Sequence, residues 1–122
     1  MKNLLAWFEI PVADIDRAIK FYKKILDVKV RKEEINGNIM GFFTNEEGGM
    51  GGALAKHKDF IPSQNGIVAY LDGGDDLQNV LDKIPIVGGK ILIPKTIITD
   101  EIGYFAWFLD SEGNRLALWS KM

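Results

Sequence analysis

The sequence predicts an α+β fold of two βαβββ modules that form a cleft between curved mixed sheets. The main observation is that one order of elements, a strand, a helix and three strands, occurs twice along the 122 residues. The helix start at Asp14-Ile15 has its counterpart at Asp76-Leu77, which gives a repeat of about 62 residues. One module alone leaves a sheet face uncovered. Pairing two modules, within one chain or across a dimer, closes a cavity.

The first module begins with an apolar stretch at residues 4–12 that has the composition of a strand. Asp14 follows in the place of a helix N-cap. Apolar residues at helical spacing follow this cap: Ile15, Ala18, Ile19, Tyr22, Ile25 and Leu26. Further along, Asn36-Gly37 is a strong hairpin-turn signal, and residues 46–49 predict a second turn. Three short strands are expected at residues 28–35, 38–44 and 50–57.

The second module repeats this order after a polar linker. A strand is expected at residues 67–72, and Asp75 or Asp76 is a candidate cap for the next helix. Pro85 should end or kink that helix. Helical spacing recurs at Leu77, Val80, Leu81 and Ile84, and three strands are expected at residues 88–94, 103–110 and 114–120. We therefore treat residues 1–122 as one domain with internal modules at residues 1–60 and 66–122.

Composition and charge exclude several classes of function. The net charge of −2 comes from 15 basic and 17 acidic residues, so nothing favours nucleic-acid binding. The absence of cysteine excludes disulfides, thiolate metal sites and a cysteine nucleophile. The N-terminal apolar run is broken by Glu9 and Pro11, which makes it a poor signal peptide. No apolar run approaches the roughly 20 residues of a membrane helix, so we expect a cytoplasmic protein without a membrane partner.

Several stretches carry a resemblance to a known family. These are FEIPVADIDRAIKFY at residues 8–22, GGALAKH at 51–57, GGK at 88–90 and GYFAWFLDSEGNRLALWS at 103–120. With the two-module order, the chain resembles the vicinal oxygen chelate superfamily. That superfamily contains glyoxalase I, bleomycin-resistance proteins and extradiol dioxygenases, and the nearest likeness is to small bacterial glyoxalase-related proteins. The resemblance implies the glyoxalase-like fold, a small-molecule ligand and a homodimer, but it leaves the chemistry open.

The resemblance also implies a divalent metal held by four side chains from the strands. Carried over to this sequence, three of those positions fall on Trp7, Val68 and Ala117. The fourth falls within residues 51–56, which contain no His, Glu or Asp. None of these side chains offers a useful lone pair. We therefore expect no metal cofactor.

Strand alternation predicts which side chains face the cleft. If Trp7 faces it, Glu9 and Pro11 do so too, because side chains on one face recur every second residue. On the second module this face would carry Val68, Tyr70, Arg115, Ala117 and Trp119. We predict Trp7, Glu9 and these five residues of the second module as the ligand-binding set, with Trp7 and Trp119 as stacking surfaces for a planar or amphipathic ligand.

Glu9 is the candidate catalytic residue, because a lone ionisable group in an apolar cleft is often functional. A structural reading stays open beside it: Glu9 pairs with Arg115 or Lys95, or lies on an exposed edge. His57, the only histidine, could be a metal ligand or a general base, but its polar neighbours favour a solvated strand end.

Two classes of function follow. The first is a small-molecule-binding protein that lacks the usual metal ligands and holds its ligand in an aromatic-lined cleft. The second is a glyoxalase-related lyase, isomerase or dioxygenase-type enzyme that uses a degenerate metal site or Glu9 as a general base. The sequence does not name the ligand.

Overall fold

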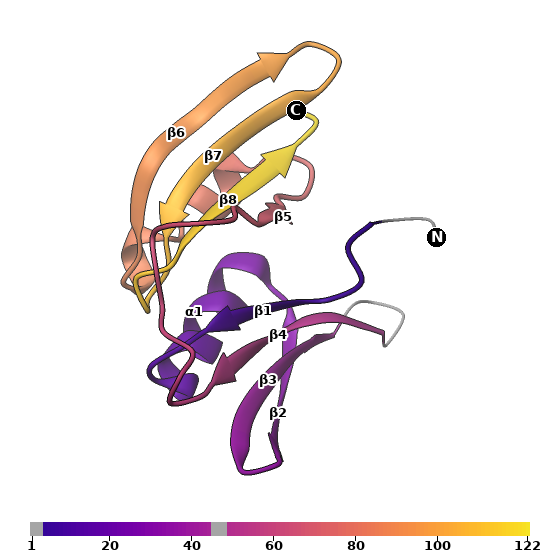
Figure 1. Ribbon diagram of the computed structural model, residues 1–122. Coiled ribbons are helices and arrows are strands. Elements are labelled where there is room, and N and C mark those ends of the chain that lie inside the picture. The colour runs from indigo at the N-terminus through magenta and orange to yellow at the C-terminus, as the bar shows by residue number, and fades with distance from the viewer. Residues whose placement is uncertain (1–3, 45–48) are drawn as a thin grey trace.

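The predicted α+β fold with two βαβββ modules is confirmed. The computed structural model describes residues 4–44 and 49–122, so most of the turn predicted at residues 46–49 lies outside the described residues. Figure 1 shows two sheets, one above the other, with the chain passing once from the first to the second. The elements are β1 (Phe8–Pro11), α1 (Ile15–Leu26), β2 (Lys29–Ile35), β3 (Asn38–Thr44), β4 (Met50–Lys56), β5 (Tyr70–Asp72), α2 (Gln78–Leu81), the 3₁₀ helix η1 (Pro85–Val87), β6 (Lys90–Thr99), β7 (Gly103–Leu109) and β8 (Arg115–Ser120).

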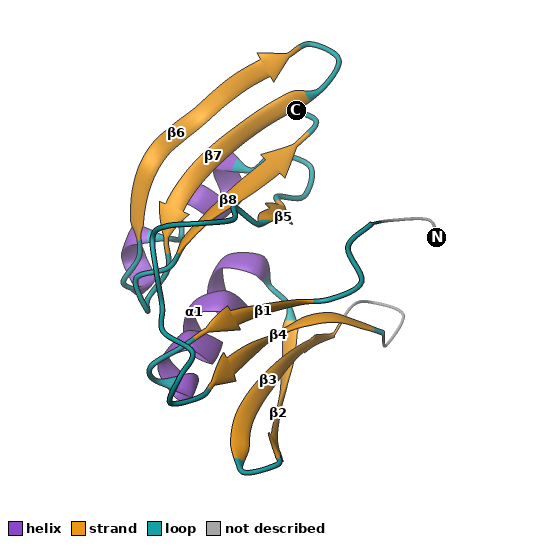
Figure 2. Ribbon diagram, in the orientation of Figure 1, coloured by secondary structure: helices purple, strands orange, loops and turns teal. Residues whose placement is uncertain are grey.

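The two sheets have the same topology, which confirms the internal repeat. The first has the strand order β1-β4-β3-β2 and the second β5-β8-β7-β6. β1 pairs with β4 in parallel, as β5 does with β8, and the other pairs are antiparallel. Figure 2 shows the helices packed against these sheets. β1 and β5 are therefore edge strands, each with one side unpaired by its own sheet.

Helix α1 forms as the sequence predicts. The Asp14 side chain accepts a hydrogen bond from the backbone N–H of Arg17 at 3.0 Å, which satisfies a free donor of the first turn. The helix ends at Asp27, which adopts the left-handed conformation with φ 51°. Its buried side chains are Ile15, Ala18, Phe21, Tyr22 and Ile25.

The second helix is shorter than its apolar spacing predicts. It covers only Gln78–Leu81, and the chain continues as a 3₁₀ turn from Pro85. The N-cap position is Leu77, whose N–H donates to the Ser120 hydroxyl at 3.0 Å. Asp76 still accepts the Gln78 N–H at 2.9 Å, so it supports the helix start from one residue earlier.

Three strands differ clearly from their predicted bounds. β1 covers only Phe8–Pro11 of the predicted residues 4–12, so Trp7 lies just before it. β5 begins at Tyr70 and not at residue 67, because Gly66 bends the linker with φ 96° and Ile67 is 96% exposed. β6 extends to Thr99, past Pro94. A proline is tolerated there because β6 is an edge strand with irregular register between Ile93 and Thr96.

Two glycine positions explain local geometry. Asn36 and Gly37 both have positive φ, 53° and 81°, as a tight hairpin turn between β2 and β3 requires. Gly52 lies inside β4, an inner strand, and a Cβ there would come within 2.3 Å of the Phe8 ring. Gly52 therefore lets the Phe8 ring pack closely against β4.

One hydrophobic core joins the two modules. Ile10 and Val12 of the first module and Leu116 and Leu118 of the second are buried in it, whereas Phe8 is only half-buried and packs against it. Across the modules, the ring of Phe21 on α1 stacks on Phe108 of β7 at 6.3 Å between centroids.

The β7–β8 turn fastens this arrangement to the start of α1. The Glu112 carboxylate accepts the backbone N–H groups of Ala13 and Asp14 at 2.9 and 2.8 Å. It also accepts both Nε and Nη2 of Arg17, at 2.7 and 3.0 Å. Burial raises the pKa of the Glu112 carboxyl, but the hydrogen bonds from Arg17, the two amides and Ser111 outweigh it and hold the pKa at about 2.

Beside these contacts of Glu112 lies a buried, hydrogen-bonded pair of polar side chains, Tyr22 and Asp110. The Tyr22 hydroxyl donates to Asp110 Oδ2 at 2.6 Å, and Asp110 is only 3% exposed. Burial, followed by the negative charge of Asp110, raises the pKa of Tyr22 well above its ordinary value. Asn114 adds a bond from its side-chain amide to the Pro11 carbonyl at 2.7 Å. The modules are thus held in one orientation by charged and polar contacts as well as by the core.

Candidate functional site

The face of the first sheet that lies opposite α1 carries Trp7 and Glu9. The strand register places Glu9 beside Ala53 of β4, and Ala53 beside Phe42 of β3, so the three side chains share this face. Trp7 lies just before β1, and its ring centroid is 6.1 Å from that of Phe42. The predicted alternation of β1 is therefore observed: Ile10 faces the core and Glu9 the open side.

Trp7, Glu9 and Phe42 border a pocket of about 630 Å³. Its size suits a small organic ligand, since such pockets usually range from roughly 300 to 1,000 Å³. The walls are mainly apolar and aromatic, with a few polar groups at the rim. The lining residues are Trp7, Glu9, Ile35, Asn36, Asn38, Met40, Phe42, Ala55, Lys56, His57, Asp59 and Phe60. We call this the Trp7 pocket.

A hydrogen bond within this pocket orients the Glu9 carboxylate. Trp7 Nε1 donates to Glu9 Oε2 at 3.2 Å. Glu9 is exposed and, among the described residues, forms no ion pair. The predicted alternatives for a partner have other contacts: Lys95 pairs with Asp76 at 2.9 Å, and Arg115 Nη2 donates to the Gly66 carbonyl at 2.7 Å. The ion-pair interpretation of Glu9 is therefore wrong, and the exposed-edge interpretation describes its position.

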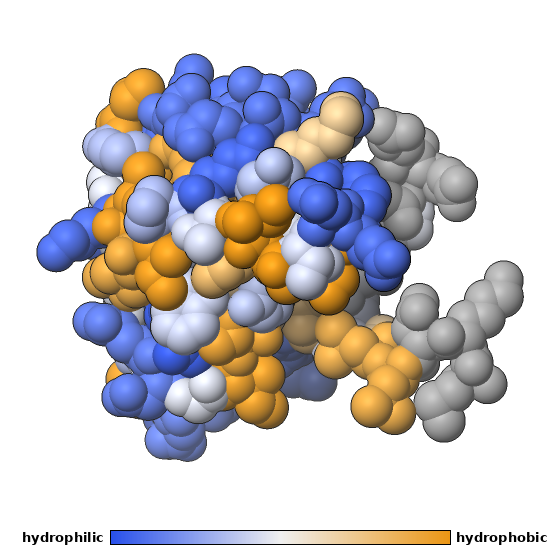
Figure 3. Space-filling model, turned by 90° about the horizontal axis from the view of Figure 1, so that it is seen from above, coloured by the Kyte–Doolittle hydropathy of each residue, from blue (hydrophilic) through white to orange (hydrophobic). Residues whose placement is uncertain are grey.

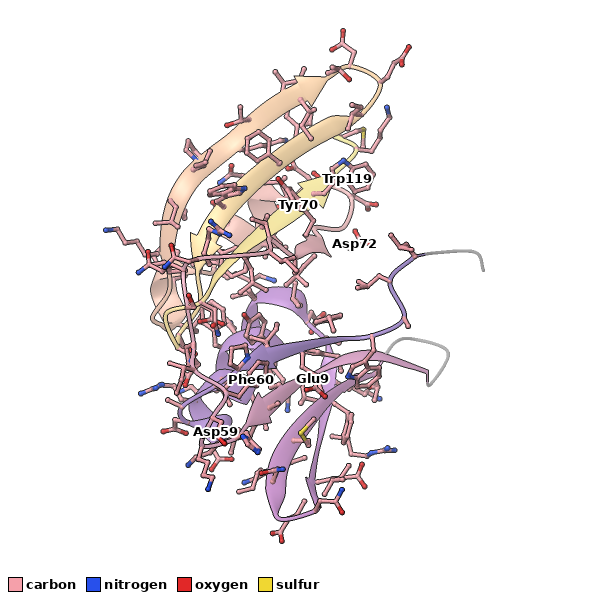
Figure 4. All side chains as sticks on the ribbon, viewed as in Figure 1. Glu9, Asp59, Phe60, Tyr70, Asp72 and Trp119 are labelled. Carbon is pink, nitrogen blue, oxygen red and sulfur yellow. The ribbon has the colours of Figure 1, made fainter. Side chains whose placement is uncertain are left out.

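His57 lies at the rim of the same pocket, immediately after β4. It is exposed, as a solvated strand end would be. Its Nδ1 accepts the backbone N–H of Asp59 at 3.1 Å, so Nδ1 is the unprotonated nitrogen in this arrangement. The Phe60 N–H bonds to the His57 carbonyl at 3.0 Å, and this tight turn brings the Phe60 side chain to the pocket wall. Figure 4 shows Glu9, Asp59 and Phe60 on the first module.

The predicted residues of the second module lie on a separate surface. The register aligns Tyr70 with Ala117, and Asp72 with Trp119. Tyr70 is 52% exposed and Trp119 36%, whereas Ala117 is fully buried beneath its neighbours. Figure 4 shows Tyr70, Asp72 and Trp119 together on the upper sheet. None of them lines the Trp7 pocket, so the structure does not bring the two predicted aromatic walls together in one chain.

Val68 and Arg115 occupy different places from the rest of that set. Val68 is half-buried in the linker before β5, outside the strand in which it was predicted. Arg115 lies at the start of β8, with its guanidinium 4.8 Å from the centre of the Trp107 ring. Arg115 and Glu9 together line a second, smaller pocket at the junction of the modules, with a volume of about 260 Å³. Pro11 also lines this junction pocket.

Sequence reasoning missed most of the residues that line the Trp7 pocket. Met40 and Phe42 belong to β3, and their period of two in residues 38–44 was a usable signal. Asn38 begins the same strand and shares this period, whereas Phe60 lies in a turn, where no periodicity indicates direction.

Hydrophobic side chains also reach the surface away from this pocket. Figure 3 shows, from above, several hydrophobic patches interrupted by polar groups. The exposed large hydrophobic side chains of the second module are Ile67, Tyr70, Ile86, Leu92, Ile97, Ile98, Ile102, Trp119 and Met122. Within the described residues, no helix is long and apolar enough to cross a membrane.

Comparison with known proteins decides the family. Residues 4–118 match the model of the Glyoxalase/Bleomycin resistance protein/Dioxygenase superfamily. The chain belongs to this superfamily. A search of the curated proteins found no match.

Solved structures of the superfamily share the fold at low sequence identity. A glyoxalase I mutant from Zea mays superposes with a TM-score of 0.76 at 22% identity, over 96% of this chain. The chain spans only 46% of the maize protein. A glyoxylase/bleomycin resistance protein/dioxygenase domain from Frankia matches with a TM-score of 0.73 at 16% identity, over 98% of this chain and 93% of that one. Glyoxalase I from Leishmania major gives 0.68 at 21%, over 98% and 88%.

The residues present do not fit the divalent metal that the superfamily implies. Trp7, Val68 and Ala117 stand at three of the mapped positions and offer no oxygen or imidazole donor. Among residues 4–44 and 49–122, no three His, Cys, Asp or Glu side chains come close enough to hold one ion. Glu9 and His57 share a pocket but do not make a complete ligand set.

Proposed function

We propose that this protein binds a small organic molecule in the Trp7 pocket without using a metal ion. The observation that carries the proposal is the combination of an aromatic wall, Trp7 and Phe42, with one oriented carboxylate, Glu9. Apolar walls with a few placed polar groups are typical of ligand pockets. The absence of suitable metal donors at the mapped positions favours binding over the metal-dependent chemistry of the superfamily.

A glyoxalase-related enzyme is the second candidate. Glu9 and His57 both line the pocket, and both are open to solvent. In this function Glu9 would act as a general base on a substrate with an acidic C–H bond. Turnover in metal-stripped protein that disappears in Glu9→Gln would establish this reading.

We further propose a cytoplasmic homodimer. The exposed aromatic surface of Tyr70 and Trp119 has the composition of interface residues, because aromatic side chains are enriched there. In one chain this surface lies apart from the Trp7 pocket. A second copy that covers it would bring Trp119 into use as the second aromatic wall expected from the sequence.

The test is a thermal-shift screen of soluble planar and amphipathic compounds on chelator-treated protein. Compounds that stabilise the native protein should do so because they bind the folded state. They should lose this effect in Trp7→Ala and keep it in the control Ile86→Ala, since Ile86 is 74% exposed on η1. Stabilisation that is equal in native protein and in Trp7→Ala would contradict the proposed site.

A further inference from the structure

We propose that the ligand is dipolar: its ammonium group lies at Glu9 and its carboxylate at Arg115, across the junction of the two modules. This inference rests on the proposed function, since the ligand's apolar part would occupy the Trp7 pocket. It adds the chemical class of the ligand, which neither the family nor the pocket shape provides. Amino acids and their derivatives belong to this class.

Glu9 borders two pockets. It lines the Trp7 pocket of about 630 Å³ and the junction pocket of about 260 Å³. Phe60 also lines both, so the two spaces adjoin at these residues. A ligand at Glu9 can therefore extend in two directions, toward the aromatic wall of Trp7 and toward Arg115 on β8.

Glu9 and Arg115 carry opposite charges. Glu9 and Arg115 line the same junction pocket, yet no ion pair joins them among the described residues. Trp7 supplies a neutral donor to Glu9 and leaves its negative charge without a cation. An ammonium group is the donor that would complement it, and the Trp7 ring adds attraction to a cation held nearby.

The hydrogen bonding of Arg115 is incomplete. Its Nε is buried and has no hydrogen-bond partner among the residues that the structure describes. Its Nη2 bonds the carbonyl of Gly66 at 2.7 Å. Nε and Nη2 lie on one edge of the guanidinium, the edge that a carboxylate binds with two parallel hydrogen bonds. The Gly66 carbonyl thus stands in for one oxygen of such a carboxylate, and the second position has no acceptor.

The linker allows this exchange. Gly66 is exposed, has φ 96°, and lies in a segment outside every helix and strand. Arg115 is meanwhile held by Trp107, whose ring lies 4.8 Å from its guanidinium carbon. A ligand carboxylate can replace the Gly66 carbonyl while the guanidinium keeps its place on the ring.

The experiment uses four probes with the same phenylalkyl body. Phenylalanine carries both charges, phenethylamine only the ammonium, 3-phenylpropionate only the carboxylate, and 2-phenylethanol neither. Their affinities for native, chelator-treated protein are measured by NMR titration. We expect phenylalanine to bind at least about tenfold more tightly than 2-phenylethanol, with the singly charged probes in between.

Variants then assign each charge to its residue. Glu9→Gln should weaken the binding of phenylalanine and phenethylamine and leave the binding of 3-phenylpropionate unchanged. Arg115→Lys keeps the positive charge but removes the edge with two parallel donors. It should therefore weaken the binding of phenylalanine and 3-phenylpropionate and leave the binding of phenethylamine unchanged. The control is Glu34→Gln: Glu34 is an exposed glutamate on β2, paired with Ile39, and lies outside both pockets. It should change none of the affinities.

Three outcomes would overturn the inference. If all four probes bind with equal affinity, the pocket binds small molecules without distinguishing their charges, and only the proposed function survives. If the charged probes bind tightly but neither Glu9→Gln nor Arg115→Lys changes their affinities, other residues bind the charged groups. If no probe binds at all, the inference and the proposed function fail together.

Discussion

The indole nitrogen of Trp7 donates a hydrogen bond to the carboxylate of Glu9, 3.2 Å away on the open face of the first sheet. The contact joins an aromatic surface and an acid, the two kinds of group that a pocket needs to hold and orient a ligand. Because Glu9 is exposed and unpaired, the contact has little structural purpose. The first predictions follow from this pair.

Glu9→Gln should leave the free energy of unfolding within about 0.5 kcal/mol of the native value, because surface changes away from special contacts rarely do more. Urea unfolding measures this. Any turnover that the native protein shows should disappear in the variant. A loss of several kcal/mol would instead reveal a buried ionic role that the structure does not contain.

Trp7→Ala should weaken ligand binding about tenfold, because it removes the ring that faces Phe42 and the donor that orients Glu9. Trp7→Phe keeps a ring and loses only the donor, so its affinity should lie between those of native protein and Trp7→Ala. Calorimetric titration of one ligand with the three proteins gives the order. Equal affinities in all three would exclude Trp7 from the site.

Glu112→Gln should destabilise the protein by about 2 kcal/mol, because a neutral amide cannot accept all the donors that converge on this carboxylate. The figure is kept low because the Arg17 side chain is 53% exposed. Denaturant unfolding at pH 7 provides the measurement.

The same carboxyl predicts a dependence of stability on pH. Its pKa is about 2 in the folded protein against an ordinary value of 4.5. Its contribution is therefore complete above about pH 5 and falls as the pH drops toward 2, because the unfolded chain takes up the proton first. Glu112→Gln should show a flatter loss of stability across this range. Parallel acid curves for the two proteins would refute the assigned role.

Tyr22→Phe should cost about 1–2 kcal/mol, because it leaves the buried Asp110 without its hydroxyl donor. Since the pKa of Tyr22 is raised, its contribution is complete below about pH 10 and is lost as the pH rises further. An absorbance titration should show that one of the three tyrosines ionises only when the protein unfolds. In Tyr22→Phe that late step should be missing.

Trp119→Glu should weaken self-association, because it places a charge in the exposed aromatic surface beside Tyr70. We expect the dimer dissociation constant to rise at least about tenfold. Sedimentation equilibrium measures it, with Ile86→Glu as the control on a different surface. A native protein that stays monomeric at high concentration would remove the basis of the dimer proposal.

Much of the fold could be predicted from the sequence because its signals are local and repeated. The helical spacing after Asp14 and the turn at Asn36-Gly37 each specify their own geometry. Alternation along β1 placed Glu9 on the face away from the core, and in the structure its neighbour Ile10 lies in the core. The short second helix was less predictable, because the Ser120 hydroxyl that holds the Leu77 N–H comes from a distant strand.

The site was harder to predict because its parts come from different elements. Phe60 reaches the Trp7 pocket through a turn closed by a hydrogen bond to the His57 carbonyl, and Arg115 and Glu9 line one pocket only because the two modules join there. The hydrogen bonds of Glu112 to Ala13 and Arg17 connect segments that lie far apart in the sequence. Such contacts depend on how the two sheets are oriented, and no local pattern encodes that.

The most direct test of metal-free binding is the NMR signal of the Trp7 indole N–H, followed while a ligand is added to protein in excess chelator. Trp7→Phe assigns the signal. We expect a saturable shift at one ligand per chain that is the same with and without chelator. A shift that appears only after Ni²⁺, Zn²⁺, Mn²⁺ or Fe²⁺ is added would mean that a metal completes the site, and it would contradict metal-free binding.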